Sequence, residues 1–119
     1  MDAKQAAREA RKKELLQELA EIKIEELREQ GVFSGVPHYS VLEQAASALG
    51  KELSCLTQER AAGEVRAESA AEAVCPTCGA KCKVETKRRE VASIDGRVTL
   101  DEASAYCQRC RRSFFPSAD

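Results

Sequence analysis

The chain has 119 residues, enough for one ordinary domain or for a small domain with a helical attachment, and leaves little room for a large catalytic fold. Only five residues are aromatic and none is tryptophan, so we expect a thin, aliphatic core. The 19 basic and 20 acidic side chains give a net charge of -1, which carries no global signal for nucleic acid or a membrane surface.

The two parts of the chain differ in charge. Residues 1–74 contain ten Lys or Arg against fourteen Asp or Glu, whereas residues 75–119 contain nine against six. We therefore expect two domains, a helical leader over 1–74 and a cysteine-rich domain over 75–119. The N-terminus lacks the apolar stretch of a signal peptide, and no run approaches the ~18 apolar residues of a membrane span. The sequence thus predicts a soluble, cytoplasmic protein without a membrane partner.

Residues 3–30 have the period of an amphipathic helix. Their apolar positions recur at spacings of four and three: Leu16, Ala20, Ile24 and Leu27. Gly31 ends this pattern. Residues 31–39 contain two glycines and one proline without any period, which indicates a loop between two helices.

A second helix is predicted to start at Ser40, where Ser40 and Glu43 match the S-x-x-E capping box. Its apolar residues form a short coiled-coil-like seam with a 4-3-4-3 spacing: Leu42, Ala46, Leu49, Leu53 and Leu56. Such a seam needs a partner surface, either the first helix or a second copy of the chain. Residues 61–74 are mostly Ala and Glu, and we expect a solvated helical extension or a linker there.

Asp95-Gly96 is the strongest hairpin signal in the chain, because a type I′ turn requires positive φ at both central residues. A turn centred there fixes the pairing of the flanking strands: Ile94 with Arg97, Ser93 with Val98, Val91 with Leu100 and Arg89 with Glu102. This register places an apolar pair beside an ion pair. Residues 81–88 are expected to add a third strand.

Two C-x-x-C motifs carry the chemistry of the chain: Cys75, Cys78, Cys107 and Cys110. Structural zinc takes four ligands in a tetrahedron, and both thiolates of such a motif can reach one ion. The 28 residues between the motifs contain the predicted hairpin, which returns the chain to its start. A disulfide framework and a redox dithiol are the alternatives, but a secretion signal and a βαβ context are both missing.

The predicted fold is therefore α+β. Helices that form a hairpin or a coiled-coil-like pair precede a small, three-stranded zinc ribbon with four cysteine ligands and one Zn2+.

Two further cysteines and the single histidine have weaker claims to the metal. Cys82 lies four residues after Cys78 and can compete as a ligand, although its use would forgo the first C-x-x-C turn; otherwise it is a small buried thiol. Cys55 neighbours the leucine seam and is interpreted as a helix packing residue rather than a reactive thiol. His38 lies in the loop and is not expected to bind metal, because four thiolates are available elsewhere.

The domain over 75–119 is basic enough to contact phosphates. Its candidate nucleic-acid-binding residues are Lys87, Arg88, Arg89, Arg97, Arg109, Arg111 and Arg112. Lys81 and Lys83 add charge nearby. A solvated polar face is the alternative, because a small domain has few interior positions. Tyr106 and the segment 114–116 are interpreted as core and docking edge rather than as base-stacking groups.

The motifs over residues 75–116 resemble the N-terminal zinc ribbon of ISKra-type insertion-sequence transposases. The resemblance rests on C-P-T-C-G, K-R-R, I-D-G-R-V-T-L and A-Y-C-Q-R-C-R-R-S-F-F-P, and less specifically on P-H-Y-S and L-G-K-E-L-S in the leader. In that family a helical leader precedes the ribbon and a DDE-type catalytic domain follows it. The resemblance implies that the four cysteines are metal ligands, and that the chain is an isolated portion that recognises transposon-end DNA or assembles the transposase.

The leading hypothesis is thus a zinc-ribbon nucleic-acid-binding module of a transposase-like protein that lacks the catalytic domain. The alternative is a zinc-stabilised protein-interaction or dimerisation module, in which the helices pack together or self-associate. An enzyme is not expected, because four thiolates leave the zinc no position for water and no nucleophile and base pair is apparent. DNA is the expected partner, bound weakly by the isolated fragment, and no small-molecule substrate is expected.

Overall fold

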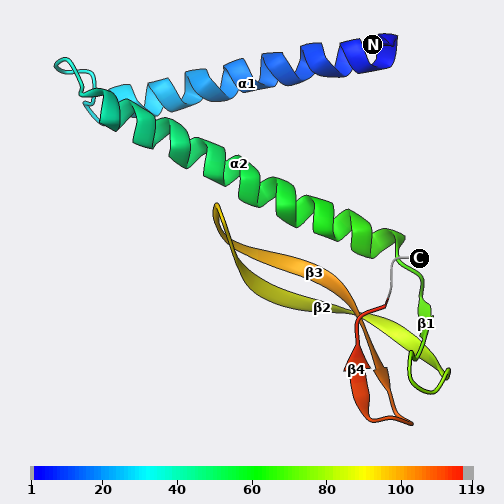
Figure 1. Ribbon diagram of the computed structural model, residues 1–119. Helices are drawn as coiled ribbons and strands as arrows, with labels where there is room; N and C mark the ends of the chain where they lie inside the picture. The colour runs from blue at the N-terminus through cyan, green and yellow to red at the C-terminus, as the bar shows by residue number, and fades with distance from the viewer. Residues whose placement is uncertain (1, 117–119) are drawn as a thin grey trace. The chain divides into compact units, whose positions relative to one another are not determined.

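Two helices are followed by a small antiparallel sheet in the computed structural model, which describes residues 2–116 (Figure 1). The elements are α1 (Ala3–Glu29), α2 (Tyr39–Glu68), β1 (Glu72–Val74), β2 (Lys81–Ser93), β3 (Gly96–Cys107) and β4 (Arg112–Phe114). The predicted α+β class is confirmed, with four strands in place of the predicted three. The separate strand predicted over residues 81–88 is wrong, because these residues are the first part of the long strand β2. By compactness the chain divides within α2, into Met1–Gly50 and Lys51–Asp119. No helix among residues 2–116 is long and apolar enough to cross a membrane.

The two helices begin with different capping arrangements. At α1, the Asp2 carboxylate accepts a hydrogen bond from the Gln5 backbone N–H (2.7 Å), and the Gln5 side chain accepts one from the Asp2 N–H (3.1 Å). The helix α2 begins at Tyr39, one residue before the predicted start. In place of the predicted capping box, the Ser40 backbone N–H donates to Nδ1 of His38 (3.2 Å), so the histidine takes the capping role.

The apolar seams predicted on the helices are largely exposed. Leu27, next to the loop, is the one buried residue in α1 and α2, all of whose residues are described. Other large apolar side chains of these helices are exposed: Leu15, Leu16, Ile22, Ile24, Leu42, Leu53 and Leu56. Their exposed fractions lie between 36% and 52%, and the coiled-coil pairing stays a prediction.

Neighbouring strands of the sheet are antiparallel, in the order β1-β2-β3-β4. The central hairpin of β2 and β3 pairs Ser93 with Gly96 and Val91 with Val98. The predicted register is therefore wrong by two residues, since it paired Ser93 with Val98. A shift of two preserves the alternation of side chains, so each residue keeps its predicted face. The core of the sheet consists of Cys75, Cys82, Val84, Ala105 and Cys107.

The turn of this hairpin explains the shift in register. Its two-residue loop is Ile94-Asp95 rather than Asp95-Gly96. Among the described residues Arg111 is the one non-glycine with positive φ, so neither loop residue has the backbone of a type I′ turn. Ser93 and Gly96 instead occupy the first and fourth positions, where a type I turn prefers serine and glycine. The Ser93 hydroxyl also accepts a hydrogen bond from the Asp95 N–H at 3.3 Å.

The predicted ion pair between Arg89 and Glu102 nevertheless forms, with 2.8 Å between Nη2 and Oε1. Leu100 is the register partner of Arg89, and Glu102 lies two residues further along the same face. A diagonal neighbour at this position is within reach of a long side chain. The ion pair therefore forms although the observed register differs by two residues from the predicted one.

Within the second compact unit, the C-terminal part of α2 lies along the β2–β3 hairpin (Figure 1). Hydrogen bonds join them: Ser54 Oγ to Asp95 Oδ2 (2.6 Å), Gln58 Nε2 to Ser93 Oγ (3.2 Å), Thr99 N to Glu59 Oε2 (2.8 Å) and Arg66 Nε to Thr86 Oγ1 (2.8 Å). Val98 is 1% exposed in this part of β3. The packing face of α2 is thus polar, and it is not the face of the predicted leucine seam.

Gly96 is required where the helix approaches the hairpin. A Cβ atom at this position would lie 3.3 Å from Cys55 Sγ, and the φ of +133° is one that L side chains rarely adopt. We expect Gly96→Ala to lower the free energy of unfolding by about 1–3 kcal/mol. Gly63→Ala is the matched control, since its Cβ would meet open space within α2, and it should be neutral or stabilise by up to about 1 kcal/mol. Urea unfolding followed by circular dichroism measures both, and equal effects would contradict the close approach.

Candidate metal centre

Each C-x-x-C motif forms the turn between two paired strands. Cys75 and Cys78 lie between β1 and β2, where the Cys75 N–H donates to the Ala80 carbonyl and the Gly79 N–H donates to the Cys75 carbonyl, both at 2.9 Å. Gly79 has a φ of +75°, a left-handed conformation that glycine adopts without steric cost. The backbone therefore folds back tightly enough to place both sulfur atoms on one side of the turn.

The second motif repeats this geometry between β3 and β4. The Cys110 N–H points at Cys107 Sγ, 3.5 Å away, and Arg111 follows with a φ of +55°. Arg111 thus occupies the position that Gly79 occupies in the first turn, in the same left-handed region. A left-handed conformation costs a non-glycine residue roughly 1–2 kcal/mol. The fold imposes this backbone on both turns, and only one of them has a glycine to accommodate it.

The four sulfur atoms of these turns form one cluster, as predicted. Cys75 Sγ lies 3.8 Å from Cys110 Sγ, Cys78 Sγ lies 3.6 Å from Cys107 Sγ, and all four lie within 4.8 Å of one another. A tetrahedron with metal–sulfur distances of about 2.3 Å has sulfur atoms about 3.8 Å apart. The cluster therefore fits one tetrahedral metal ion. Its donor set consists of four cysteines drawn equally from the two turns.

Backbone amides prepare two of the thiols for metal binding. Hydrogen bonds from the Cys78 and Thr77 amides lower the pKa of Cys75 to about 6, and the Cys110 amide lowers the pKa of Cys107. The hydrogen bond with the Cys78 sulfur, together with burial, raises the pKa of Cys110 to about 12. Four sulfurs at this spacing repel one another as thiolates, so a cation is needed to hold all four deprotonated.

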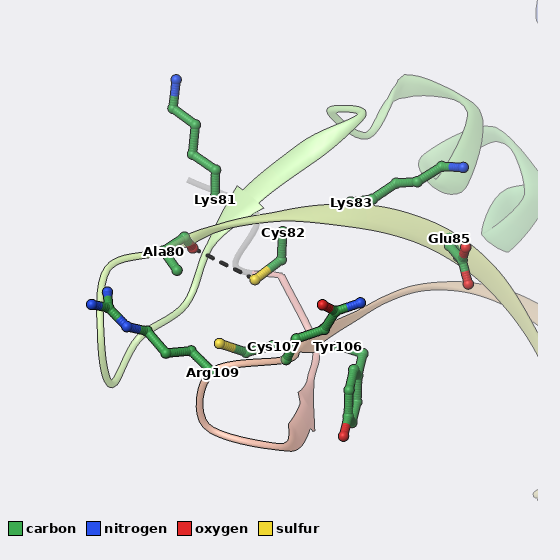
Figure 2. A pocket seen from close by; sticks show the side chains of 9 residues that line it. Ala80, Lys81, Cys82, Lys83, Glu85, Tyr106, Cys107 and Arg109 are labelled. Atoms are coloured by element: carbon green, nitrogen blue, oxygen red, sulfur yellow. Dashed lines mark hydrogen bonds between the residues drawn. The ribbon is translucent and has the colours of Figure 1, made fainter.

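Cys82 lies outside the cluster, although it is buried beside it. Figure 2 shows its thiol directed toward the Ala80 carbonyl, to which it donates at 3.5 Å. Burial raises the pKa of Cys82. Its sulfur is not among the four that lie within 4.8 Å of one another, and this geometry rather than its pKa excludes it from the donor set. Cys55 is half-buried in α2 and its thiol donates to the Asp95 carbonyl at 3.5 Å, which fits the predicted packing role.

The structure divides the predicted nucleic-acid-binding residues into two groups. Three arginines of the β2–β3 hairpin pair with carboxylates on the neighbouring strand: Arg88 with Asp101, Arg89 with Glu102 and Arg97 with Glu90. The remaining four have no carboxylate within ion-pair distance among residues 2–116: Lys87, Arg109, Arg111 and Arg112. Three of these four lie in or directly after the second cysteine turn.

Lys81 and Lys83 join Arg109 in lining a pocket beside the cysteine cluster (Figure 2). Tyr106 and Gln108 also line it, and the tyrosine ring is about half exposed. The sequence contained a signal for the lysines, because they alternate with the buried Cys82 and Val84 along one strand. Both lysines lie outside the set of nucleic-acid-binding residues predicted from the sequence.

No protein-family model, no curated protein and no solved structure matches the chain. The function is therefore argued from the site itself. Its chemistry is that of four converging thiols that fit one metal ion, with cationic side chains next to them.

The cluster predicts that Cys107 is essential for metal binding. Cys107→Ser should abolish binding of one metal ion per chain and unfold the ribbon, because ligation and folding are coupled in small metal domains. Cys82→Ser is the matched control, since it changes a thiol that is also buried but lies outside the cluster, and it should retain one ion. Native mass spectrometry and the absorption of Co2+-loaded protein report the metal count. Loss of metal in the Cys82 variant would contradict the assignment of the ligands.

Proposed function

We propose that the chain is a zinc-ribbon nucleic-acid-binding module of a transposase-like protein, in which zinc is structural and the chain itself is not an enzyme. The observation that carries this proposal is the group of unpaired cations around the cysteine turns. Five side chains form this group, which we call the knuckle cations: Lys81, Lys83, Arg109, Arg111 and Arg112. They lie next to a closed metal site rather than around a reactive one.

Zinc is the metal that fits the donor set best. Four thiolates in a tetrahedron are the typical ligands of structural zinc, and they leave no open position for water or substrate. Soft thiolates also disfavour the hard cations Mg2+ and Ca2+, which take oxygen ligands. The metal would therefore join the two cysteine turns, and this chain's own side chains would contact the partner.

The distribution of charge favours the knuckle cations over the hairpin arginines. Arg88, Arg89 and Arg97 each have a carboxylate neighbour, so a phosphate must compete with it. Among the described residues no carboxylate lies within ion-pair distance of the knuckle cations, although Glu85 lines the same pocket as Lys81 and Lys83. Four thiolates and one zinc ion together add about -2 to the ribbon, which makes these uncompensated cations decisive for attracting phosphate.

Arg111 gives independent support for a role outside folding. Its φ of +55° is a conformation in which glycine would be more stable, as Gly79 is in the first turn. Strained residues in a native structure often serve a function that offsets their cost. A phosphate contact by the guanidinium group would account for an arginine here.

The transposase-like assignment rests on the motif resemblance over residues 75–116. A second candidate is a protein-interaction module, and the exposed leucines and isoleucines of α1 and α2 favour it. The two functions are compatible within one chain, because the cations and the apolar side chains lie on different elements. Only the nucleic-acid-binding function requires the knuckle cations.

The proposal predicts that Arg111→Gly separates DNA binding from stability. Removing the left-handed strain should leave metal binding intact and stabilise the ribbon by up to about 1 kcal/mol. Loss of one phosphate contact should at the same time weaken DNA binding and reduce the log-log salt slope by about 0.9. Fluorescence anisotropy with labelled duplex DNA at several salt concentrations measures both, with dissociation constants expected at about 10⁻⁴ to 10⁻⁶ M in physiological salt.

Arg88→Ala is the matched control for this experiment. It removes the same charge from an arginine that already pairs with Asp101, and its effect on the slope should be smaller. Two results would contradict the proposal: no DNA binding by the zinc-loaded protein even at low salt, or identical slopes for both variants. Either would favour the protein-interaction module.

A further inference from the structure

The charges of α1 are segregated along its length. Residues 3–13 contain five basic side chains and one acidic side chain, whereas residues 14–29 contain six acidic and two basic ones. The basic half has a net charge of about +4 and the acidic half about -4 by this count. The whole helix is therefore almost neutral but strongly polarised along its axis.

This polarity opposes the helix dipole. The N-terminal end of a helix is partially positive and the C-terminal end partially negative, so acidic residues stabilise the former and basic residues the latter. In α1 the first turn contains no acidic residue, and Glu25, Glu26 and Glu29 lie near its end. The ion pairs found within α1 are Lys12 with Glu9 and Lys23 with Glu26, each confined to one half. Helix stability alone thus does not account for the arrangement.

The same helix exposes large apolar side chains. Leu15, Leu16, Ile22 and Ile24 are each between 43% and 52% exposed, although the helix has a buried position at Leu27. An amphipathic helix of this kind gains most of its stability by burying such side chains against another surface. Leu15 and Ile22 lie seven residues apart and share one face of the helix, whereas Ile24 lies about 200° around the helix from Ile22. Any partner of α1 must therefore cover the face of Leu15 and Ile22 and match a helix that is basic at one end and acidic at the other.

We propose that this partner is the α1 helix of a second copy, packed antiparallel. A two-fold axis through the centre of Ala3–Glu29 passes near Leu16 and places the basic half of each copy along the acidic half of the other. In this register Arg8 and Arg11 of one copy lie along Glu21 and Glu25 of the other. A parallel pair would instead place like charges side by side, which is unfavourable. The antiparallel pair satisfies the charge pattern and brings Leu15 of the two copies together beside the two-fold axis, with Ile22 of each copy opposite Ala10 of the other.

The inference does not depend on the bound metal or on nucleic acid, because α1 lies in the first compact unit and the cysteines in the second. Two variants of the full, zinc-loaded chain test it. One reverses the basic half (Arg8→Glu, Arg11→Glu and Lys12→Glu), and the other reverses the acidic half (Glu18→Lys, Glu21→Lys and Glu25→Lys). Lys, Arg and Glu are comparable helix formers, so circular dichroism should show α1 retained in both.

Sedimentation equilibrium should give a dimer of the unmodified protein at low salt that weakens as salt is added, because the attraction between exposed charges is screened. Each variant alone should have a dimer dissociation constant at least about tenfold higher, since attraction becomes repulsion at several pairs. An equimolar mixture of the two variants should recover a dimer that contains one copy of each. The control changes the same charge outside α1, with Lys51→Glu, Lys83→Glu and Lys87→Glu, and should keep the dimer.

Three results would overturn the proposal. The first is sedimentation of the unmodified protein as a monomer at every concentration and salt. The second is a dimer that tightens with salt, as expected for parallel helices or for purely apolar association. The third is dimerisation of the two α1 variants as strong as that of the control, which would place the interface elsewhere.

Discussion

The cluster of four sulfur atoms is the constraint on which the second unit depends. Two short hairpins, β1–β2 and β3–β4, extend from the end of the central β2–β3 hairpin that lies opposite its turn. The outer strand of each, β1 or β4, has only three residues. Strands of this length cannot hold a register by themselves. The cysteine turns at their tips converge, and most of the buried residues of the sheet surround that point. A metal ion bound there would replace the apolar core that so small a domain cannot build.

The far end of the central hairpin is held differently, by polar contacts with α2. Ser54 and Gln58 contact Asp95 and Ser93 at the turn, and Glu59 accepts the Thr99 N–H from the strand beyond it. These contacts are partly exposed, and each contributes about 1 kcal/mol at most. The hairpin is thus held by the cysteine cluster at one end and by specific but weak hydrogen bonds at the other. Its two ends should differ in their sensitivity to metal removal and to substitution.

The sequence was sufficient for the parts of the structure that local chemistry determines. The C-x-x-C spacing led to the cysteine cluster, and the apolar period led to both helices within one or two residues except at the end of α2. The hairpin register was predicted wrongly because Ser93, Asp95 and Gly96 fit two overlapping turns, with Asp95-Gly96 or Ile94-Asp95 as the loop. Only the pairing of the complete strands selects one of them. β1 and β4 were missed because three residues are too few to show a period. The packing face of α2 was missed because its contacts are polar, and hydrophobic spacing does not report them.

Composition also does not report which cations pair with a carboxylate. This division of the cations bears on the ribbon and on α1 together. From composition, nine basic residues of the second domain were equivalent, but pairing across β2 and β3 neutralises three. The other six are Lys87 and the five knuckle cations beside the cysteine turns. So few free cations, close to a cluster of thiolates, attract a polyanion only weakly. Two such sites held in one particle can bind the same duplex together, and the second contact then occurs at a high effective concentration. Pairing through α1 would thus raise the affinity for DNA by holding two ribbons together, although each ribbon alone has too few free cations to bind DNA tightly.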